Sequence, residues 1–202
     1  SRKAKGDPAT AAQIYEKALS NGLLIYIPAA AGLSLVADPL IQILFGEQYL
    51  GAVPVLQVLS IFVILQSIKL LTDNGLDFLG HAQGRAIIKG ITAVLNVCLN
   101  LILIPRIGVV GAASATVLTD TIYTISIMYV MSTEMDFYSD ELLRKIVLII
   151  LITIIMSSVV YFLRSFIEGI ISLMVVVFIG ITVWFILSLV ADLLDRNQIS
   201  LG

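Results

Sequence analysis

Six long apolar runs, separated by short polar connections, constrain this chain more than any other feature. A helix needs about 20 apolar residues to cross the hydrocarbon core of a bilayer, and each run is close to or above that length. The runs are continuously apolar and do not alternate with polar residues, so transmembrane strands are excluded. The sequence therefore predicts an all-α polytopic membrane protein with six transmembrane helices. These are expected at residues 22–45, 52–79, 86–104, 109–131, 144–163 and 170–191.

Composition supports a membrane protein and excludes several other classes. The 202 residues are 59% hydrophobic and 13% charged, against about 45–50% and about 25% in an ordinary soluble domain. A net charge of −2 provides no basic field for nucleic acid. The single cysteine, Cys98, excludes an internal disulfide and a cysteine-based metal site. With one histidine, no P-loop and no glycine-rich dinucleotide motif, we predict neither enzyme activity nor a cofactor.

The chain begins with a polar, basic stretch at Ser1 and not with Met and a signal peptide, so we expect a piece of a longer protein. Asp7 followed by Pro8 is a helix-start signal, with an N-cap and then proline at the first helical position. A short amphipathic helix is predicted over residues 8–20. It is expected to lie at the membrane surface and to lead into the first transmembrane helix.

Polar connections divide the chain into five segments. The longest connection separates four transmembrane helices, which carry most of the polar residues, from a terminal hairpin that carries little besides Ser and Thr. Ser139 is placed to cap the fifth helix, whose first turn is acidic. The predicted segments are 1–21 (cytoplasmic, with the surface helix), 22–131 (four transmembrane helices), 132–143 (cytoplasmic linker), 144–191 (terminal hairpin) and 192–202 (cytoplasmic tail).

Lys and Arg are distributed unevenly between the two sides of the membrane. Six spans place both termini on one side, and only Arg106 and Arg164 fall on the other. Because connections rich in Lys and Arg stay in the cytoplasm, both termini are predicted to be cytoplasmic, in a multi-pass protein of the cell membrane. The residues on the cytoplasmic side are Arg2, Lys3, Lys5, Lys17, Arg85, Lys89, Arg144, Lys145 and Arg196.

Charged side chains recur on the second predicted helix. Lys69, Asp73 and Asp77 are four residues apart and share one face, with Gln66 beside them. A charge at the bilayer centre costs about 2.5–3.5 kcal/mol on insertion scales, so this face must meet the bundle interior or a water-filled cavity. Two interpretations stay open: a stripe that lines a substrate or ion cavity, or a Lys69–Asp73 pair that only fixes helix packing. We favour the cavity for the stripe as a whole and packing at the cytoplasmic mouth for Asp77.

The third and fourth predicted helices also carry polar side chains. Asn96 and Asn100 are four residues apart, and either form interhelical hydrogen bonds, typically worth about 0.6–2 kcal/mol, or line the cavity. Asp120 lies near the middle of the fourth helix, where an unpaired carboxylate would be protonated. It can pair with Lys69 across the bundle or take part in proton or cation coupling.

Between these two helices, Pro105 and Gly108 predict a tight turn. Small residues after the turn, such as Gly111 and Ala115, allow another helix to approach closely.

Arg85 and Lys89 follow the second helix at the cytoplasmic mouth of the predicted bundle. Their charges suit a phosphate group, and the excess of cytoplasmic positive residues explains them equally well without a function.

Residues 20–131 resemble the C-terminal region of the polysaccharide/oligosaccharide flippases, in the multidrug/oligosaccharidyl-lipid/polysaccharide exporter superfamily. The resemblance rests on the order and spacing of three motifs. They read Leu-Phe-Gly-Glu-x-Tyr from residue 44, Leu-Gly-x-x-x-Gly-Arg from residue 79, and Asn-x-x-x-Asn-x-x-x-Ile-Pro-x-x-Gly-x-x-Gly-Ala-Ala-x-Ala-Thr from residue 96.

The resemblance implies a full protein of twelve or fourteen helices, in two lobes around a central cavity. This chain would supply the last four helices of the second lobe and a terminal helix pair, with the missing N-terminal lobe as its partner. Family members flip undecaprenyl- or dolichyl-linked sugars across the membrane by alternating access, through a cationic cavity. The alternatives are a cation-coupled multidrug exporter of the same superfamily and a non-transporting membrane scaffold.

Lys69 is the residue here best suited to the headgroup of such a lipid-linked sugar. Asp73 beside it departs from a purely cationic cavity. Asp73 and Asp120 resemble instead the coupling carboxylates of the drug-exporting relatives.

Overall fold

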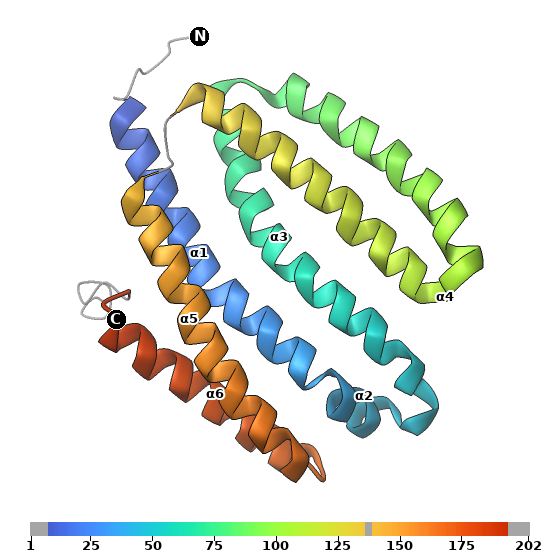
Figure 1. Cartoon of the computed structure of the whole chain (residues 1–202). Coiled ribbons are helices and arrows are strands. Elements are labelled where there is room, and N and C mark those ends of the chain that lie inside the picture. The colour runs from blue at the N-terminus through green and yellow to red at the C-terminus, as the bar shows by residue number, and fades with distance from the viewer. Residues whose placement is uncertain (1–7, 136–138, 194–202) are drawn as a thin grey trace.

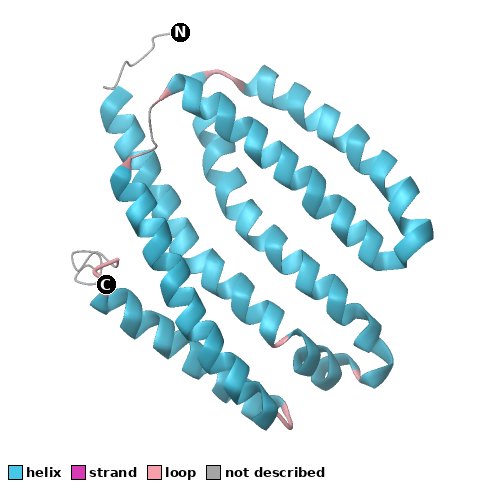
Figure 2. Ribbon diagram, in the orientation of Figure 1, coloured by secondary structure: helices cyan, strands magenta, loops and turns pink. Residues whose placement is uncertain are grey.

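The computed structural model describes residues 8–135 and 139–193, and every regular element in them is helical (Figure 2). Because the described residues contain no strand, the all-α prediction is confirmed. The elements are α1 (Pro8–Leu35), α2 (Ala37–Phe45), η1 (Glu47–Ala52), α3 (Val53–Leu79), α4 (Ala82–Glu134), α5 (Asp140–Leu163), η2 (Arg164–Phe166) and α6 (Ile170–Val190). The predicted N-cap Asp7, the basic residues before it and most of the predicted tail lie outside the described residues.

Five helices, α1, α3, α4, α5 and α6, are long and apolar enough to cross a membrane. The 53-residue α4 is a hairpin of two arms, residues 82–106 and 109–134, that lie side by side (Figure 1). The described chain therefore contains six segments of membrane-spanning length. The predicted polytopic class is confirmed.

The turn of the α4 hairpin depends on two glycines. The backbone leaves helical geometry at Ile107 and at Gly108, whose φ of +63° favours glycine. At Gly111, a Cβ atom would lie 2.5 Å from the carbonyl oxygen of Leu103 on the other arm, so the two backbones meet there without room for a methyl group. The predicted Pro105–Gly108 turn and the small-residue face after it are both present in the structure.

Helix α1 lies between α3 and α5, with the α4 hairpin on the far side of α3 and α6 against α5 (Figure 1). The main apolar core joins buried residues of four helices, among them Leu24 of α1, Leu76 of α3, Ile127 of α4 and Ile149 of α5. Helices α5 and α6 form the predicted terminal pair, and this pair packs on α1 as part of the same bundle. Helices α1 and α5 pack along each other, because apolar side chains of both helices belong to this core.

The connection between α4 and α5 is shorter than the predicted linker 132–143. The second arm of α4 continues to Glu134, and α5 begins at Asp140. The Oγ atom of Ser139 accepts a hydrogen bond from the backbone N–H of Leu142 at 3.1 Å, so the predicted N-cap is confirmed.

The first predicted transmembrane helix differs most from the structure. A single helix, α1, replaces the predicted surface helix at 8–20 and the start of the span at 22–45. Tyr15 and Leu19, in the supposed surface helix, are buried in the core. The helix ends at Leu35 because Pro39, four residues later, has no N–H to donate to the Leu35 carbonyl. The rest of the predicted span forms the separate α2.

Candidate functional site

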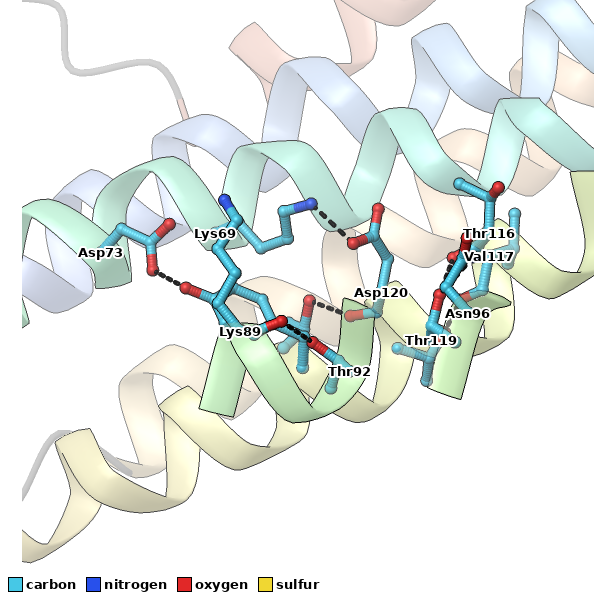
Figure 3. Close-up of polar contacts among 12 residues, drawn as sticks. Lys69, Asp73, Lys89, Thr92, Asn96, Thr116, Val117, Thr119 and Asp120 are labelled. Carbon is cyan, nitrogen blue, oxygen red and sulfur yellow. Dashed lines mark hydrogen bonds and ion pairs between the residues drawn. The ribbon is translucent and has the colours of Figure 1, made fainter. Parts of the chain in front are cut away.

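The charged face of α3 meets the α4 hairpin. The Nζ atom of Lys69 lies 2.9 Å from Oδ1 of Asp120 on the second arm, with 12% and 22% of the two side chains exposed (Figure 3). Of the two pairings left open by the sequence, the structure contains the one across the bundle and not the Lys69–Asp73 pair along the helix. Two oppositely charged side chains are thereby neutralised within an apolar bundle.

Aromatic rings complete the surroundings of Lys69. Its Nζ atom lies 5.0 Å from the centre of the Phe62 ring and 5.9 Å from that of Tyr123. A cation at this distance from a ring is attracted by the electrons of the ring face. The ammonium group is therefore stabilised by one carboxylate and two rings, which accounts for a lysine with so little exposure.

Arg85 connects the two remaining carboxylates of the stripe. Its Nε and Nη2 atoms donate to the two oxygens of Asp77 at 2.9 and 2.7 Å, and Nη1 lies 3.6 Å from Oδ2 of Asp73. A bidentate arginine–carboxylate contact fixes the relative orientation of the two side chains in addition to pairing their charges. Asp77 and Arg85, both predicted at one mouth of the bundle, are brought together there, and Arg85 is occupied by carboxylates.

Tyr123 is a member of this network that sequence reasoning missed. Its hydroxyl donates to Oδ1 of Asp73 at 2.7 Å, and the residue is 2% exposed. Tyr123 follows Asp120 by three residues and therefore shares its helix face. That spacing was the available signal, and it was overlooked because a tyrosine in an apolar run is usually counted with the apolar residues.

Two predicted site residues stay at the edge of the network. Lys89 is exposed, with its Nζ atom 5.7 Å from the centre of the Tyr123 ring, and it forms no ion pair with any described residue. Gln66 is also exposed and forms no hydrogen bond with the part of the chain that the structure describes. Its role as a cavity-lining residue stays a prediction.

The two asparagines bind the hairpin to itself. Nδ2 of Asn96 donates to Oγ1 of Thr119 on the opposite arm at 3.0 Å (Figure 3). Nδ2 of Asn100 donates to Oδ1 of Asn96 on the same arm at 2.9 Å. Only the Asn96–Thr119 bond crosses between the arms, because Asn100 bonds to Asn96 on its own arm. A further contact, between Nε2 of His81 and Oε1 of Glu134 at 2.9 Å, joins the open ends of the two arms.

The network as a whole carries no net charge. It combines three cationic side chains with three carboxylates, and only Lys89 among the cations lacks a carboxylate partner in the described residues. An anion that approaches Lys69 or Arg85 competes with the carboxylates already bound there. Residues 8–135 and 139–193 contain no group of His, Cys, Asp or Glu side chains arranged to hold a metal ion. The six charged members are Lys69, Asp73, Asp77, Arg85, Lys89 and Asp120.

A separate polar pocket of about 720 Å³ opens between α1, α5 and the end of α6. Its lining includes Glu16, Lys17, Glu141, Lys145 and Asp192, and none of the network residues. Sequence reasoning did not identify it, because its residues come from three segments that are far apart in the chain, 12–24, 139–149 and 192–193.

Comparison with known proteins connects this arrangement to one family. A family model described as lipid II flippase MurJ matches residues 1–182. An uncharacterised membrane protein of Methanocaldococcus jannaschii, MJ1068, is 30% identical over 165 residues, which are 78% of this chain and 32% of that protein. A probable low-salt glycan biosynthesis flippase of Haloferax volcanii, Agl15, is 34% identical over 112 residues, which are 55% of this chain and 24% of that protein.

Among solved structures, the lipid II flippase MurJ in an inward closed conformation has the same fold. The TM-score is 0.72 at 19% sequence identity, and the match covers 93% of this chain and 43% of that one. The chain thus spans about a third or less of the curated relatives and under half of the solved structure. The likeness establishes how the six helical segments are arranged.

Proposed function

The chain belongs to the lipid II flippase MurJ family, and we propose that it forms the C-terminal part of a transporter that flips lipid-linked glycans across the membrane. The observation that carries this proposal is the match of that family over residues 1–182, which include nearly all of the described bundle. The flippase name of the Haloferax relative supports the same substrate class. Transport by alternating access would need a further N-terminal lobe, and the relatives are long enough to contain one. No enzymatic step is proposed for this part of the protein. The comparisons do not favour the multidrug exporter or the scaffold.

The charge network is proposed as the part of this lobe that responds to the headgroup. Lys89 is exposed and free of carboxylates, so it would meet a pyrophosphate first. Lys69 would follow by exchanging Asp120 for the phosphate, which leaves the lysine neutralised throughout. Asp120, once released, and Asp73 would then accept a proton or a cation. Every carboxylate of the network has a cationic partner, because an unpaired charge inside the membrane is costly. An exchange of partners is consistent with this, since Lys69 always keeps one anion beside it.

Orientation and location complete the proposal. We place both ends of the described chain at the cytoplasmic face of the cell membrane. Arg85 and Lys89 follow the α3–α4 turn, and Arg144 and Lys145 begin α5, at the end of the bundle that carries both termini (Figure 1). This asymmetry follows the known excess of positive residues on the cytoplasmic side.

The decisive experiment measures flipping by the full-length protein in proteoliposomes. A fluorescent lipid-linked oligosaccharide is incorporated, and its accessibility to an impermeant quencher is followed with time. Protein-containing vesicles are expected to equilibrate the labelled lipid faster than protein-free vesicles. Export of cationic dyes without any movement of the labelled lipid would reject the flippase and favour the multidrug exporter.

A further inference from the structure

Pro28 leaves one backbone carbonyl without its usual partner in the middle of α1. The helix continues through this proline from Pro8 to Leu35. Proline has no N–H, so the carbonyl of Leu24, four residues earlier, receives no hydrogen bond within the helix. Leu24 lines the inner part of the polar pocket between α1 and α5, but it is only 3% exposed, so solvent has little access to replace the lost bond.

Trp184 of α6 supplies the missing donor. Its indole Nε1–H donates to the Leu24 carbonyl oxygen at 3.0 Å. The indole N–H is a donor only, so it matches the one acceptor that Pro28 creates. Trp184 is the single tryptophan of the chain, and its ring packs against the main core. A donor on the last helix therefore completes the hydrogen bonding of the first.

A second polar contact attaches the terminal pair to the same helix. The carboxylate of Glu16 on α1 accepts hydrogen bonds from the backbone N–H of Ser139 at 3.2 Å and from its hydroxyl at 2.8 Å. Ser139 is the residue that caps α5. Each helix of the pair is thus bound to α1 at its own point, through Ser139 for α5 and through Trp184 for α6.

On its other side, α1 is bound to the helix that carries the charge network. The hydroxyl groups of Tyr15 and Thr72 lie 2.6 Å apart in the buried α1–α3 interface. A Cβ atom on Gly22 would lie 2.8 Å from Oγ of Ser67, so the two helices also approach closely there. Thr72 is next to Asp73 in the sequence. Helix α1 therefore connects the terminal pair to the network.

We propose that Trp184 is a positioning residue that controls bending of α1 at Pro28 and makes the terminal pair move together with α1. Helices bend where proline removes a hydrogen bond. While the indole occupies the Leu24 carbonyl, the two halves of α1 and α6 are held in one arrangement. Release of the indole would free α1 to bend and would loosen α6. The consequence for transport rests on the proposed function, whereas the coupling of the helices does not.

A double-mutant cycle in the full-length protein separates the hydrogen bond from packing. Pro28→Ala restores an N–H that can donate to the Leu24 carbonyl, so the indole is no longer needed. Trp184→Phe is therefore expected to lower Tm in detergent about twice as much with Pro28 as with Ala at that position. Equal decreases in both backgrounds would show that Trp184 acts by packing alone and would overturn the proposal. Phe185→Leu, a change at the exposed neighbouring ring, is the control and should give equal decreases.

A second measurement applies if Pro28→Ala does not fold. The benzothiophene analogue of tryptophan at position 184 keeps the size of the ring and lacks the N–H. Spin labels at Ile14 of α1 and Ile186 of α6, both exposed, report the distance between the helices in a background from which Cys98 and any other cysteine of the full-length protein are removed. A broader distance distribution with the analogue is expected. An unchanged distribution together with an unchanged Tm would overturn the coupling.

The flipping assay then tests the consequence for transport. A several-fold slower flipping of labelled lipid by Trp184→Phe, with the broader label distances, is expected. Broader distances at an unchanged flipping rate would overturn the role in transport. If the unmodified protein flips no lipid-linked glycan, the proposed function fails by itself, and the label distances still decide whether Trp184 couples α6 to α1.

Discussion

The ammonium group of Lys69 on α3 lies 2.9 Å from the carboxylate of Asp120 on the second arm of α4. This ion pair joins two residues that are more than fifty positions apart in the sequence, and both side chains are mostly buried. Breaking a buried pair by removing one partner costs far more than the pair itself contributes, because the other charge is left uncompensated. The pair is therefore the most sensitive point of the network.

Removing either charge of this pair should destabilise the protein. Lys69→Ala and Asp120→Ala are each expected to lower the free energy of unfolding by about 3 kcal/mol, seen as a lower Tm in detergent. The exchanged variant, Lys69→Asp with Asp120→Lys, should recover much of the loss because it restores opposite charges. Lys89→Ala is the matched control, since Lys89 is exposed and has no ion pair with the described residues, and it should leave Tm unchanged.

The exchanged variant also distinguishes a structural role from a transport role. A headgroup that displaces Asp120 from Lys69 needs a cation on α3, so the exchanged variant should be stable and yet flip labelled lipid slowly. Normal flipping by this variant would restrict the pair to packing. An exchanged variant as unstable as the single variants would contradict the ion pair itself.

The hydroxyl of Tyr123 should matter in a way that an ordinary tyrosine on the same helix does not. Tyr123→Phe removes the donor to Asp73 and leaves a carboxylate less well bonded in a buried position, at a cost of about 1–3 kcal/mol. Tyr129→Phe is the same chemical change on the same arm at a residue that is 71% exposed. A lower Tm is expected for the first variant only. Equal values for the two variants would show that the Tyr123–Asp73 bond adds nothing.

The periodicity of α3 was sufficient to predict part of this network. Lys69 and Asp73 were placed on one face by their spacing alone, and the structure turns that face to α4. The partners were not predictable in the same way. Arg85 reaches Asp77 because the turn after Leu79 reverses the chain within two residues, and Tyr123 reaches Asp73 because of where the hairpin packs. Spacing along one helix does not contain that information.

The same limit explains the error in the first helix. The polar residues between positions 8 and 20 indicated a surface helix, yet Tyr15 is buried because its hydroxyl has a partner in Thr72 of α3. Tertiary contacts decide whether a helix with polar residues lies at the surface or is buried, and the sequence of one segment does not show those contacts. The end of α1 has a local cause in the sequence, the proline at position 39. This cause was not recognised, because the residues on both sides of the proline belong to one long apolar run.

Membrane orientation gives a prediction that does not depend on transport. In a background from which Cys98 and any other cysteine of the full-length protein are removed, single cysteines at Gln83 and Gln48 mark opposite ends of the bundle, and both positions are exposed. Because Lys and Arg concentrate at the end that holds Gln83, an impermeant maleimide added to intact cells should label position 48 and spare position 83. Labelling of position 83 alone would reverse the proposed orientation. Permeabilised cells provide the control, since both positions should then react.

Two glycines of α4 should respond in opposite directions to the same substitution. At Gly111 an added methyl group would lie 2.5 Å from the Leu103 carbonyl oxygen, which is backbone and cannot move aside without opening the hairpin. Gly111→Ala is therefore expected to lower the free energy of unfolding by about 1–3 kcal/mol. At Gly90 an added methyl group meets no atom within 4 Å, so Gly90→Ala should raise that free energy by about 0.5–1 kcal/mol through its better helix propensity.

Unfolding of the full-length protein by denaturant in detergent measures both changes against the unmodified protein. A neutral Gly111→Ala would mean that the two arms are not packed as closely as the Gly111–Leu103 contact requires. The Asn96–Thr119 bond joins the same two arms. Asn96→Ala combined with Gly111→Ala is therefore expected to lower the free energy of unfolding by more than the sum of the two single changes. Strict additivity would instead show that the turn and the asparagine hold the hairpin independently.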